Sequence, residues 1–488
     1  MRINPVYVWV SLLSWMAIAV AIAYLSRRGL GEGASEYFLG GRKLSGFISG
    51  LSYSATTYSA FMLVGLVGLT YDSGVGALGF EMTYLMFTVL LLAVFAPRFW
   101  LAGNKYEFIT PAELLAQRYE TRWAGIVASV VFLVMLVPYA AVQLMGIGFL
   151  VEGLTGGRIP YMAGVGVMAG FAGFAALWAG MRSVSWTDAF QAITMLTTSL
   201  FALFYIFFHF FGSPGNFFRT ITVDHPELLK LTWDPRLFIG LALPWAFFAL
   251  TNPQVSQRML VPDKISSLKR MIIYFSAFGF VYTVISTLFG FQAASLLPNL
   301  ENPDKAMPVL LTRVPLPLGL IIFIGIFAAA TSTLGSITLT LSSSISRDLA
   351  QNLLPGADES LHLRLGKLAI PLLIGVFVLF AWLQPGLIAV LSSMASGGLL
   401  VTAPALIGAF YWKGGTGAGV VTSMSAGGIF TGLLYVTDFK PFGWWPSVWG
   451  FLLTAFLFVS VSLFTASPEK AEEFVDFVNR RMKEVSNR

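Results

Sequence analysis

Apolar runs of about twenty residues, separated by short polar connections, recur from one end of the chain to the other. Runs of this length match the hydrocarbon core of a bilayer, which is about 30 Å thick. The pattern therefore predicts an all-α polytopic membrane protein with about thirteen transmembrane helices. The predicted spans are residues 6–25, 45–71, 78–100, 122–152, 159–181, 186–212, 236–258, 269–297, 315–349, 365–383, 387–411, 415–435 and 445–465.

The span 315–349 carries a seam of small and hydroxyl side chains along one helical face. Its members recur at steps of three and four residues: Ala329, Ser332, Thr333, Ser336, Thr340, Ser343 and Arg347. Hydroxyl and carbonyl oxygens are hard ligands that suit Na⁺ rather than a transition metal. The same side chains also strengthen helix packing in membranes. The seam thus fits an ion site or a packing surface.

Two spans, 45–71 and 236–258, carry interruptions. The first places the hydroxyl-rich stretch LSYSATTYS (51–59) in mid-membrane, and the second places Asn252 and Pro253 deep in an apolar run. Proline removes a backbone donor and favours a local break. A kink without a function is one explanation. However, two broken spans that lie five spans apart are typical of inverted-repeat transporters, in which opened backbone forms the ion and substrate site.

Composition excludes several other classes of protein. Of 488 residues, 56% are hydrophobic and 11% charged, and the mean hydropathy of +0.76 leaves no room for a soluble domain. The absence of cysteine excludes disulfides and thiolate metal sites. The three histidines, His209, His225 and His362, are scattered along the chain, and no phosphate-binding loop accompanies them, which disfavours an enzyme. The short tail offers no output domain for a sensor.

The charges predict the orientation in the membrane. With the N-terminus outside, 22 of the 30 Lys and Arg residues lie on the inner side, as the positive-inside rule requires. The same rule explains the net charge of +6 without a nucleic-acid partner. Arg27 and Arg28 follow the first span, which is the reverse of a signal peptide, so this helix is expected to be retained. The cytoplasmic tail is predicted to be an amphipathic helix on the membrane surface, with Phe474, Val475, Phe477 and Val478 on its apolar face.

Five sequence motifs carry a resemblance to a known family. They are YFLGGRKL (37–44), LSYSATTYS (51–59), SWTD (185–188), NPQVSQR (252–258) and AAATSTLGS (328–336). In these stretches the chain resembles the solute:sodium symporter family, which includes the sodium/proline, pantothenate, sialic acid and sodium/glucose transporters. The resemblance implies a plasma-membrane symporter that uses alternating access and has a LeuT-type fold of five plus five inverted helices. One extra helix would precede this core and two would follow it.

The implied organisation divides the chain into five parts. These are an N-terminal helix and linker (1–44), a first repeat (45–212), a second repeat with an external loop at 213–235 (213–411), two extra helices (412–465) and a cytoplasmic tail (466–488). The implied partners are Na⁺ as the coupling ion, a small solute and membrane lipid, with no organic cofactor. No feature of the sequence indicates an oligomeric state.

The resemblance also implies a sodium site between the second and ninth spans. Its ligands would be the backbone carbonyls of Ala55, Tyr58 and Ala329 and the hydroxyls of Ser332 and Thr333. Some relatives bind a second sodium through the aspartate of SWTD and further serines. Asp188 and Ser336 match that site, whereas Gly335 stands where those relatives have serine. Asp188 could equally cap a helix N-terminus, and Arg182 or Arg258 could be its partner.

The solute cavity implied by the family is lined from four spans. The matching positions are Thr57, Ser59, Ala60, Met62, Tyr139, Gln143, Trp245 and Ala249. The sodium/proline branch has aspartate at Thr57 and an aromatic residue at Ala249, which argues against proline as the solute. Glu81 falls where sugar-transporting relatives place a substrate-binding Glu or Gln, although it could instead sit in interfacial water. A sugar or polyol, or an amino-acid-like zwitterion whose ammonium meets Glu81, fits best. Proton coupling through Glu81 and Asp188 is the alternative.

Overall fold

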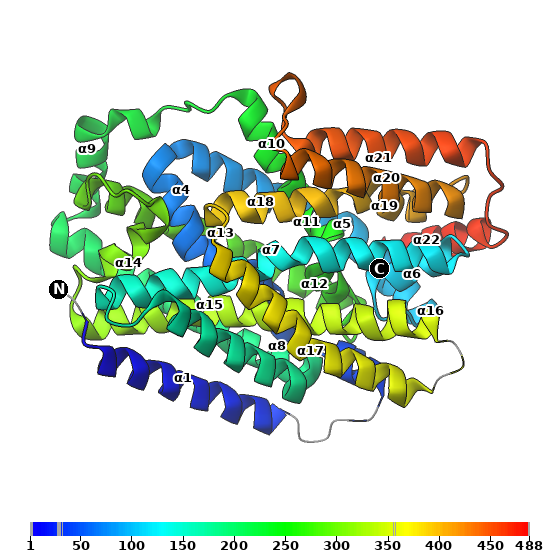
Figure 1. Cartoon of the computed structure of the whole chain (residues 1–488), viewed down its shortest axis with the longest axis horizontal. Helices are drawn as coiled ribbons and strands as arrows, with labels where there is room; N and C mark the ends of the chain where they lie inside the picture. The colour runs from blue at the N-terminus through cyan, green and yellow to red at the C-terminus, as the bar shows by residue number, and fades with distance from the viewer. Residues whose placement is uncertain (1–2, 27–30, 32, 355, 357, 487–488) are drawn as a thin grey trace.

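The computed structural model describes residues 3–26, 31, 33–354, 356 and 358–486, and this part of the chain is a bundle of helices (Figure 1). The elements that build the bundle are α1 (Pro5–Ser26), α3 (Gly46–Thr57), η2 (Phe61–Gly65), α4 (Leu66–Ser73), α5 (Val75–Tyr106), α7 (Arg122–Thr155), α8 (Tyr161–Phe210), α10 (Pro235–Ala246), α11 (Phe248–Thr251), α12 (Pro253–Ser256), η4 (Gln257–Leu260), α13 (Ile265–Leu296), α15 (Leu316–Ser343), η6 (Ser344–Ala350), α16 (Gln351–Leu353), α17 (Glu359–Leu383), α18 (Ile388–Leu399), η7 (Leu400–Thr402), α19 (Ala403–Tyr411), α20 (Gly417–Val436) and α21 (Pro446–Leu463).

Shorter helices lie in the connections and the tail. They are α2 (Ala34–Leu39), η1 (Gly40–Arg42), α6 (Pro111–Arg118), α9 (Pro214–Asp224), η3 (Pro226–Leu229), η5 (Pro303–Lys305), α14 (Ala306–Leu311), η8 (Pro441–Gly443) and α22 (Ala471–Ser486). Asp304 in η5 accepts a 3.0 Å hydrogen bond from the Ile388 amide and so caps the first turn of α18. Burial raises the pKa of Asp304 to about 6, although this hydrogen bond opposes the shift.

Eleven helices of the described residues are long and apolar enough to cross a membrane, when α8 is counted as two, Tyr161–Trp178 and Gly180–Phe210. The two parts meet at a break at Gly180, whose backbone is not helical (φ 68°, ψ 172°). The eleven helices coincide with eleven of the thirteen predicted spans. The other two predicted spans, 45–71 and 236–258, are the interrupted ones, and each is divided into shorter helical pieces. Length and apolar content thus identify the continuous helices. The pieces of the two interrupted spans are each too short to be recognised as a membrane-crossing helix.

The breaks lie within the two stretches expected to be interrupted. The first piece, α3, ends at Thr57, and Tyr58 then adopts an extended conformation (φ −92°, ψ 93°) before the chain resumes as the π-helix η2. In the other interrupted span, Asn252 is likewise extended (φ −89°, ψ 108°) between α11 and α12. Pro253 follows it at the first position of α12, where the missing amide costs least.

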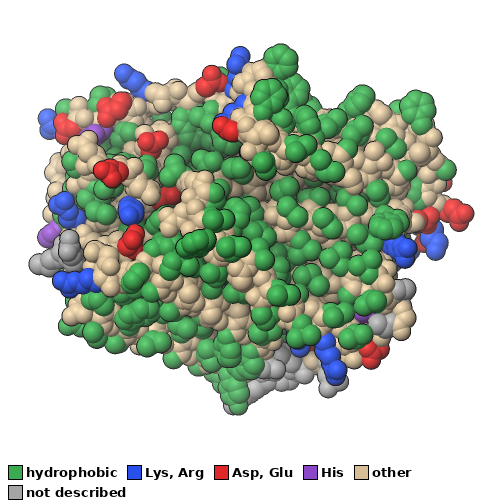
Figure 2. Space-filling view, in the orientation of Figure 1, with side chains coloured by type: hydrophobic (Ala, Val, Ile, Leu, Met, Phe, Trp, Pro, Cys, Tyr) green, Lys and Arg blue, Asp and Glu red, His purple; other side chains and the backbone are tan. Residues whose placement is uncertain are grey.

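The surface agrees with a membrane location. Figure 2 shows hydrophobic side chains over the middle of the face in view and most of the charged side chains toward its two ends. α1 packs along α8 at the edge of the bundle, and exposed Val6, Val10 and Leu13 lie on its outer side. Such exposure of large apolar side chains is expected where lipid is the solvent.

The C-terminal helix corrects one expectation. The apolar face of α22 packs on the protein rather than being free to enter the membrane surface: Phe474, Val475 and Val478 are buried, and the ring of Phe474 stacks on Tyr106 at 5.0 Å. The polar face is tied to a loop by Lys413, which contacts Glu472 and Asp476 at 2.8 and 2.9 Å. These two carboxylates raise the pKa of Lys413. The amphipathic pattern was correct, but its apolar face serves tertiary packing.

The orientation gives a direct prediction. We expect a tag after Arg488 to be cytoplasmic and a tag before Met1 to be external, because the Lys and Arg bias places the connection after each odd-numbered span inside. The N-terminal end of α1 and helix α22 lie toward opposite ends of the molecule, in keeping with this expectation (Figure 1). Protease treatment of intact cells is the measurement, and cleavage of the C-terminal tag from outside would contradict the thirteen-span prediction. Arg27, Arg28 and Arg488, which the charge argument uses, lie outside the described residues.

Candidate functional site

The end of α3 meets the hydroxyl seam of α15 near the first break. The Ser332 hydroxyl lies 2.7 Å from the Ala55 carbonyl oxygen and 2.9 Å from that of Ala329. The Thr333 hydroxyl lies 3.0 Å from the Thr56 carbonyl oxygen and 3.3 Å from that of Ala55. The structure therefore brings together four of the five residues expected to hold sodium. The fifth, Tyr58, is the extended residue that directly follows α3.

The break explains why these carbonyls are available. The last carbonyl groups of a helix have no partner within the helix, and in α3 they meet the hydroxyls of the neighbouring span instead. A hydroxyl oxygen keeps lone pairs even when its proton is donated. The cluster is buried and carries no formal charge. Neutral oxygens of this kind suit an alkali cation that must bind and leave in each cycle.

Asp188 pairs with Arg258 beside this cluster. Its Oδ2 atom lies 2.8 Å from the Arg258 guanidinium and also accepts a 2.8 Å hydrogen bond from the Ser52 hydroxyl. Both charged side chains are buried. The capping interpretation of Asp188 is wrong, because the helical segment begins at Gly180, two turns before it. Of the two arginines considered, Arg258 is the partner.

Aromatic side chains pack around the two breaks. The Trp245 ring stacks on Phe61 and on Phe248 with 5.1 Å between centroids in each case, and Tyr84 meets it edge-on at 5.2 Å. Its indole nitrogen donates a 2.9 Å hydrogen bond to the Ser393 hydroxyl. Trp245 is therefore held in place by α18 and by the aromatic cluster.

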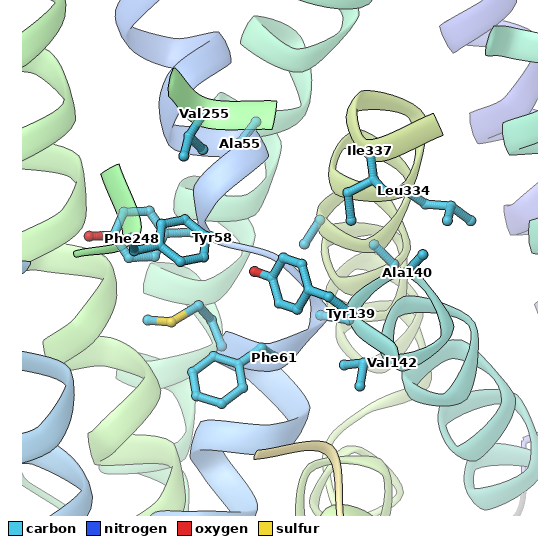
Figure 3. Close-up of a cluster of buried hydrophobic side chains, with 14 of the residues drawn as sticks. Ala55, Tyr58, Phe61, Tyr139, Ala140, Val142, Phe248, Val255, Leu334 and Ile337 are labelled. Carbon is cyan, nitrogen blue, oxygen red and sulfur yellow. The ribbon is translucent and has the colours of Figure 1, made fainter. Parts of the chain in front are cut away.

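The Tyr139 side chain enters this region from α7. Its hydroxyl points toward the break after α3, with Tyr58 and Phe248 on the far side (Figure 3). Its ring lies edge-on to Trp245 and to Phe248, with centroid distances of 6.3 and 6.1 Å. The aromatic walls expected from the sequence therefore meet at the two breaks.

Glu81 lies inside the bundle, two turns into α5. Its exposed fraction is 0%, and neither carboxylate oxygen has a hydrogen-bond partner among the described residues. The interfacial-water interpretation is therefore wrong. Tyr84, one turn later on α5, also has a buried hydroxyl without such a partner. The ring of Tyr84 lies edge-on to that of Tyr58, with 6.3 Å between the ring centroids. An unpaired carboxylate in such surroundings is costly, which is typical of a functional group.

Other predicted solute residues hold the second half of the broken span. Gln143 accepts a 3.1 Å hydrogen bond from the Ala60 amide and donates one of 3.1 Å to the Tyr139 carbonyl. The Ser59 hydroxyl accepts a hydrogen bond from the Phe61 amide at 3.2 Å. These contacts satisfy two amides at the start of this half-helix. Thr57, Met62 and Ala249 are buried in the same region, and the Thr57 hydroxyl has no hydrogen-bond partner in the described part of the chain.

Sequence reasoning missed several residues of the site. The unassigned ones are Ser52, Thr56, Tyr84, Phe248 and Ser393. Tyr84 carries a usable signal, because residues three apart on a helix share a face and it follows Glu81 at that spacing. Ser52 and Thr56 lie four residues apart, which also places them on one face of α3. Phe248 and Ser393 depend on tertiary contacts between separate spans, which no local pattern encodes.

Comparisons with known proteins agree with this geometry. The sequence profile described as Sodium:solute symporter family matches residues 37–427. The sodium/pantothenate symporter of Escherichia coli (strain K12) is 26% identical over 467 residues, covering 93% of this chain and 96% of that protein. The sodium/proline symporter of Staphylococcus aureus is 25% identical over 486 residues, covering 94% and 93%.

Two solved structures share the fold. A Na⁺-coupled sialic acid symporter in a substrate-bound outward-open state superimposes with a TM-score of 0.79 at 20% identity, covering 94% of this chain and 98% of that one. A nucleobase-cation-symport-1 family transporter in a closed conformation gives a TM-score of 0.56 at 12% identity, covering 91% and 98%. At these identities the likeness concerns the fold alone.

Proposed function

Because the chain belongs to the sodium:solute symporter family, we propose that it couples Na⁺ influx across the plasma membrane to uptake of a small polar organic solute. The broken spans α3–α4 and α10–η4 would close around solute and ion in an alternating-access cycle. If Na⁺ favours the solute-competent state, each ligand tightens binding of the other. This mutual dependence is the property to be tested.

The meeting of α3 and α15 is the observation that carries the proposal. Carbonyls of Ala55 and Ala329 and hydroxyls of Ser332 and Thr333 converge there without a fixed charge. Together with the Tyr58 carbonyl they would supply five neutral oxygens to one Na⁺. The five-plus-five inverted repeat would place these ligands at the midplane, where ion and solute sites of such transporters lie.

The solute is proposed to be a sugar or polyol, or an amino-acid-like zwitterion, held beside Glu81. The buried Glu81 carboxylate and the Tyr84 hydroxyl, which both lack partners among the described residues, could form hydrogen bonds with the hydroxyls of a polyol or with an ammonium group. Trp245 and Tyr139 would supply aromatic walls against the apolar face of the solute. The amides of Ala60 and Phe61 already have partners, so a zwitterion's carboxylate would need another donor.

Proton coupling is the nearest alternative, and one observation favours it: the Glu81 carboxylate has no counter-charge within hydrogen-bonding distance among the described residues. Asp188 is poorly suited to a relay, because its charge is already balanced by Arg258. Dependence of uptake on Na⁺ at fixed pH separates the two mechanisms. Uptake that follows the pH gradient and ignores Na⁺ would favour the alternative.

The experiment that tests the function is a thermal-shift screen of the purified protein over sugars, polyols, amino acids and carboxylates, with Na⁺ or with K⁺. We expect a true solute to raise the unfolding temperature mainly in Na⁺, because a ligand stabilises the state it binds. The same rise in K⁺ at equal ionic strength would contradict Na⁺ coupling. Solutes identified in this way can then be used in uptake assays.

A further inference from the structure

The Arg258 guanidinium fills a buried cluster of oxygen atoms. It lies 2.8 Å from Asp188 Oδ2, 2.7 Å from the Ser336 hydroxyl and 3.2 Å from the Ser52 hydroxyl. It also donates a 2.9 Å hydrogen bond to the Gln254 carbonyl of its own span. The Thr56 hydroxyl completes the cluster, at 3.4 Å from Asp188 and 3.1 Å from Ser336.

This set of atoms is what a small cation would require. One carboxylate and three hydroxyls are hard oxygen ligands that suit Na⁺. Here the charge of the carboxylate is balanced by the guanidinium of Arg258, which is part of the protein itself. The N–H groups of the planar guanidinium reach three of these four side chains. Asp188 and Arg258 are both nearly inaccessible to solvent, with exposed fractions of 1% and 2%. A buried carboxylate of this kind needs one positive partner, and it already has one.

In the described part of the chain, the surroundings of Asp188 offer a second ion no further negative charge. A cavity of about 40 Å³ adjoins Asp188 on the side of α1, and its walls are mainly apolar, including Phe171, Phe174 and Val184. Gly335 brings no hydroxyl, although a Cβ atom there would meet nothing within 4 Å. The wall also carries the polar side chains of Thr187, Gln191, Thr331 and Ser332, which are neutral. Among the described residues, Asp188 is the only charged one that lines the cavity, and Arg258 already balances its charge.

We propose that Arg258 is the built-in cation of the Asp188 site, so that the protein binds one Na⁺ in each cycle and Asp188 receives no second ion. This inference rests on the proposed Na⁺ symport. Arg258 acts as a positioning residue, because it joins α3, α8, α15 and its own span at one point. Ser336 connects it to the first sodium site, since its hydroxyl also lies 2.7 Å from the Ser332 carbonyl oxygen.

The test is equilibrium binding of ²²Na⁺ to the purified full-length protein, with Na⁺ alone as the probe. We expect the wild type to bind one Na⁺ per chain with a Hill coefficient of about 1. Arg258→Gln removes the charge and shortens the side chain, so Asp188 should then recruit a second Na⁺ and the number bound should rise to two. Arg258→Lys keeps the charge and should remain at one.

The double variant Asp188→Asn with Arg258→Gln leaves no charge in this cluster. It provides a second measurement if Arg258→Gln alone does not fold. We expect it to bind one Na⁺ with the half-saturation of the wild type. Two Na⁺ per wild-type chain, a folded Arg258→Gln that still binds one, or loss of a bound Na⁺ in the double variant would each overturn the inference. A wild type that binds no Na⁺ would instead contradict the proposed symport, so the two failures are distinguishable.

Discussion

Ser332→Ala and Thr333→Ala should each raise the Na⁺ concentration for half-maximal uptake at least roughly tenfold, which corresponds to about 1.4 kcal/mol. Each substitution removes one oxygen from the cluster formed with the Ala55 carbonyl. Folding should survive, since alanine is the best helix former and both positions lie inside α15. The measurement is initial uptake against Na⁺ concentration at saturating solute, with the amount of protein at the cell surface determined for every variant.

Thr333→Ser is the matched control for this prediction. It keeps the hydroxyl oxygen and removes only a methyl group, so the sodium curve should change little if the side chain is a ligand. A packing role would follow the volume of the methyl group instead. A normal sodium curve in Thr333→Ala together with an impaired Thr333→Ser would show that the seam is a packing surface. The sodium site would then have to lie elsewhere.

The sequence predicted those features that follow from local chemistry. Apolar runs give the continuous spans, because every backbone polar group in lipid must be satisfied within a helix. The breaks at Tyr58 and Asn252 follow from a hydroxyl-rich stretch and from Asn-Pro, both of which are unusual in mid-membrane. The seam on α15 could also be identified from the sequence, because polar side chains in a membrane-spanning helix are expected to face other helices. Ser332, Thr333 and Ser336 all contact protein groups from other spans or their own helix.

The features that the sequence could not decide depend on tertiary contacts. Asp188 had two candidate partners, and only the packing of the seventh span beside α3 selects Arg258 over Arg182. The burial of Glu81 also depends on its neighbours, because its position two turns into α5 is compatible with water or with the bundle interior. The apolar face of α22 matched lipid and protein equally well. The choice of protein follows from aromatic contacts such as Phe474 with Tyr106.

The two halves of the proposed site share one helix. Thr56 contributes its carbonyl to the Thr333 hydroxyl and its own hydroxyl to the Asp188 cluster. Any movement of α3 that opens one cluster must therefore disturb the other. The break after Thr57 separates both clusters from the second half of the span, which Gln143 holds through the Ala60 amide. We therefore expect ion binding and closure of the broken span to depend on each other.

Glu81→Gln should weaken the apparent affinity for the solute by roughly tenfold or more while Na⁺ binding without solute stays nearly unchanged. The substitution keeps the shape of the side chain and removes its charge. A hydrogen bond to a charged group contributes about 1.5–3 kcal/mol, and each 1.4 kcal/mol corresponds to a factor of ten. The measurement is the half-saturating concentration of the solute found in the thermal-shift screen, determined in saturating Na⁺.

A matched control is Glu152→Gln, which makes the same chemical change in a partly exposed glutamate that pairs with Lys305 at 3.3 Å. Because Glu152 contacts none of the site residues named above, its substitution should leave solute affinity unchanged. A fall in affinity in this variant as well would show that loss of any glutamate charge weakens solute binding. Equal affinities in Glu81→Gln and the wild type would assign Glu81 a structural role. If affinity falls while the Na⁺ curve without solute is preserved, the carboxylate acts on the solute itself. A parallel loss of Na⁺ binding would instead mean that removing the charge disturbs the break at Tyr58, since the Tyr58 ring lies 6.3 Å from that of Tyr84 on the Glu81 helix.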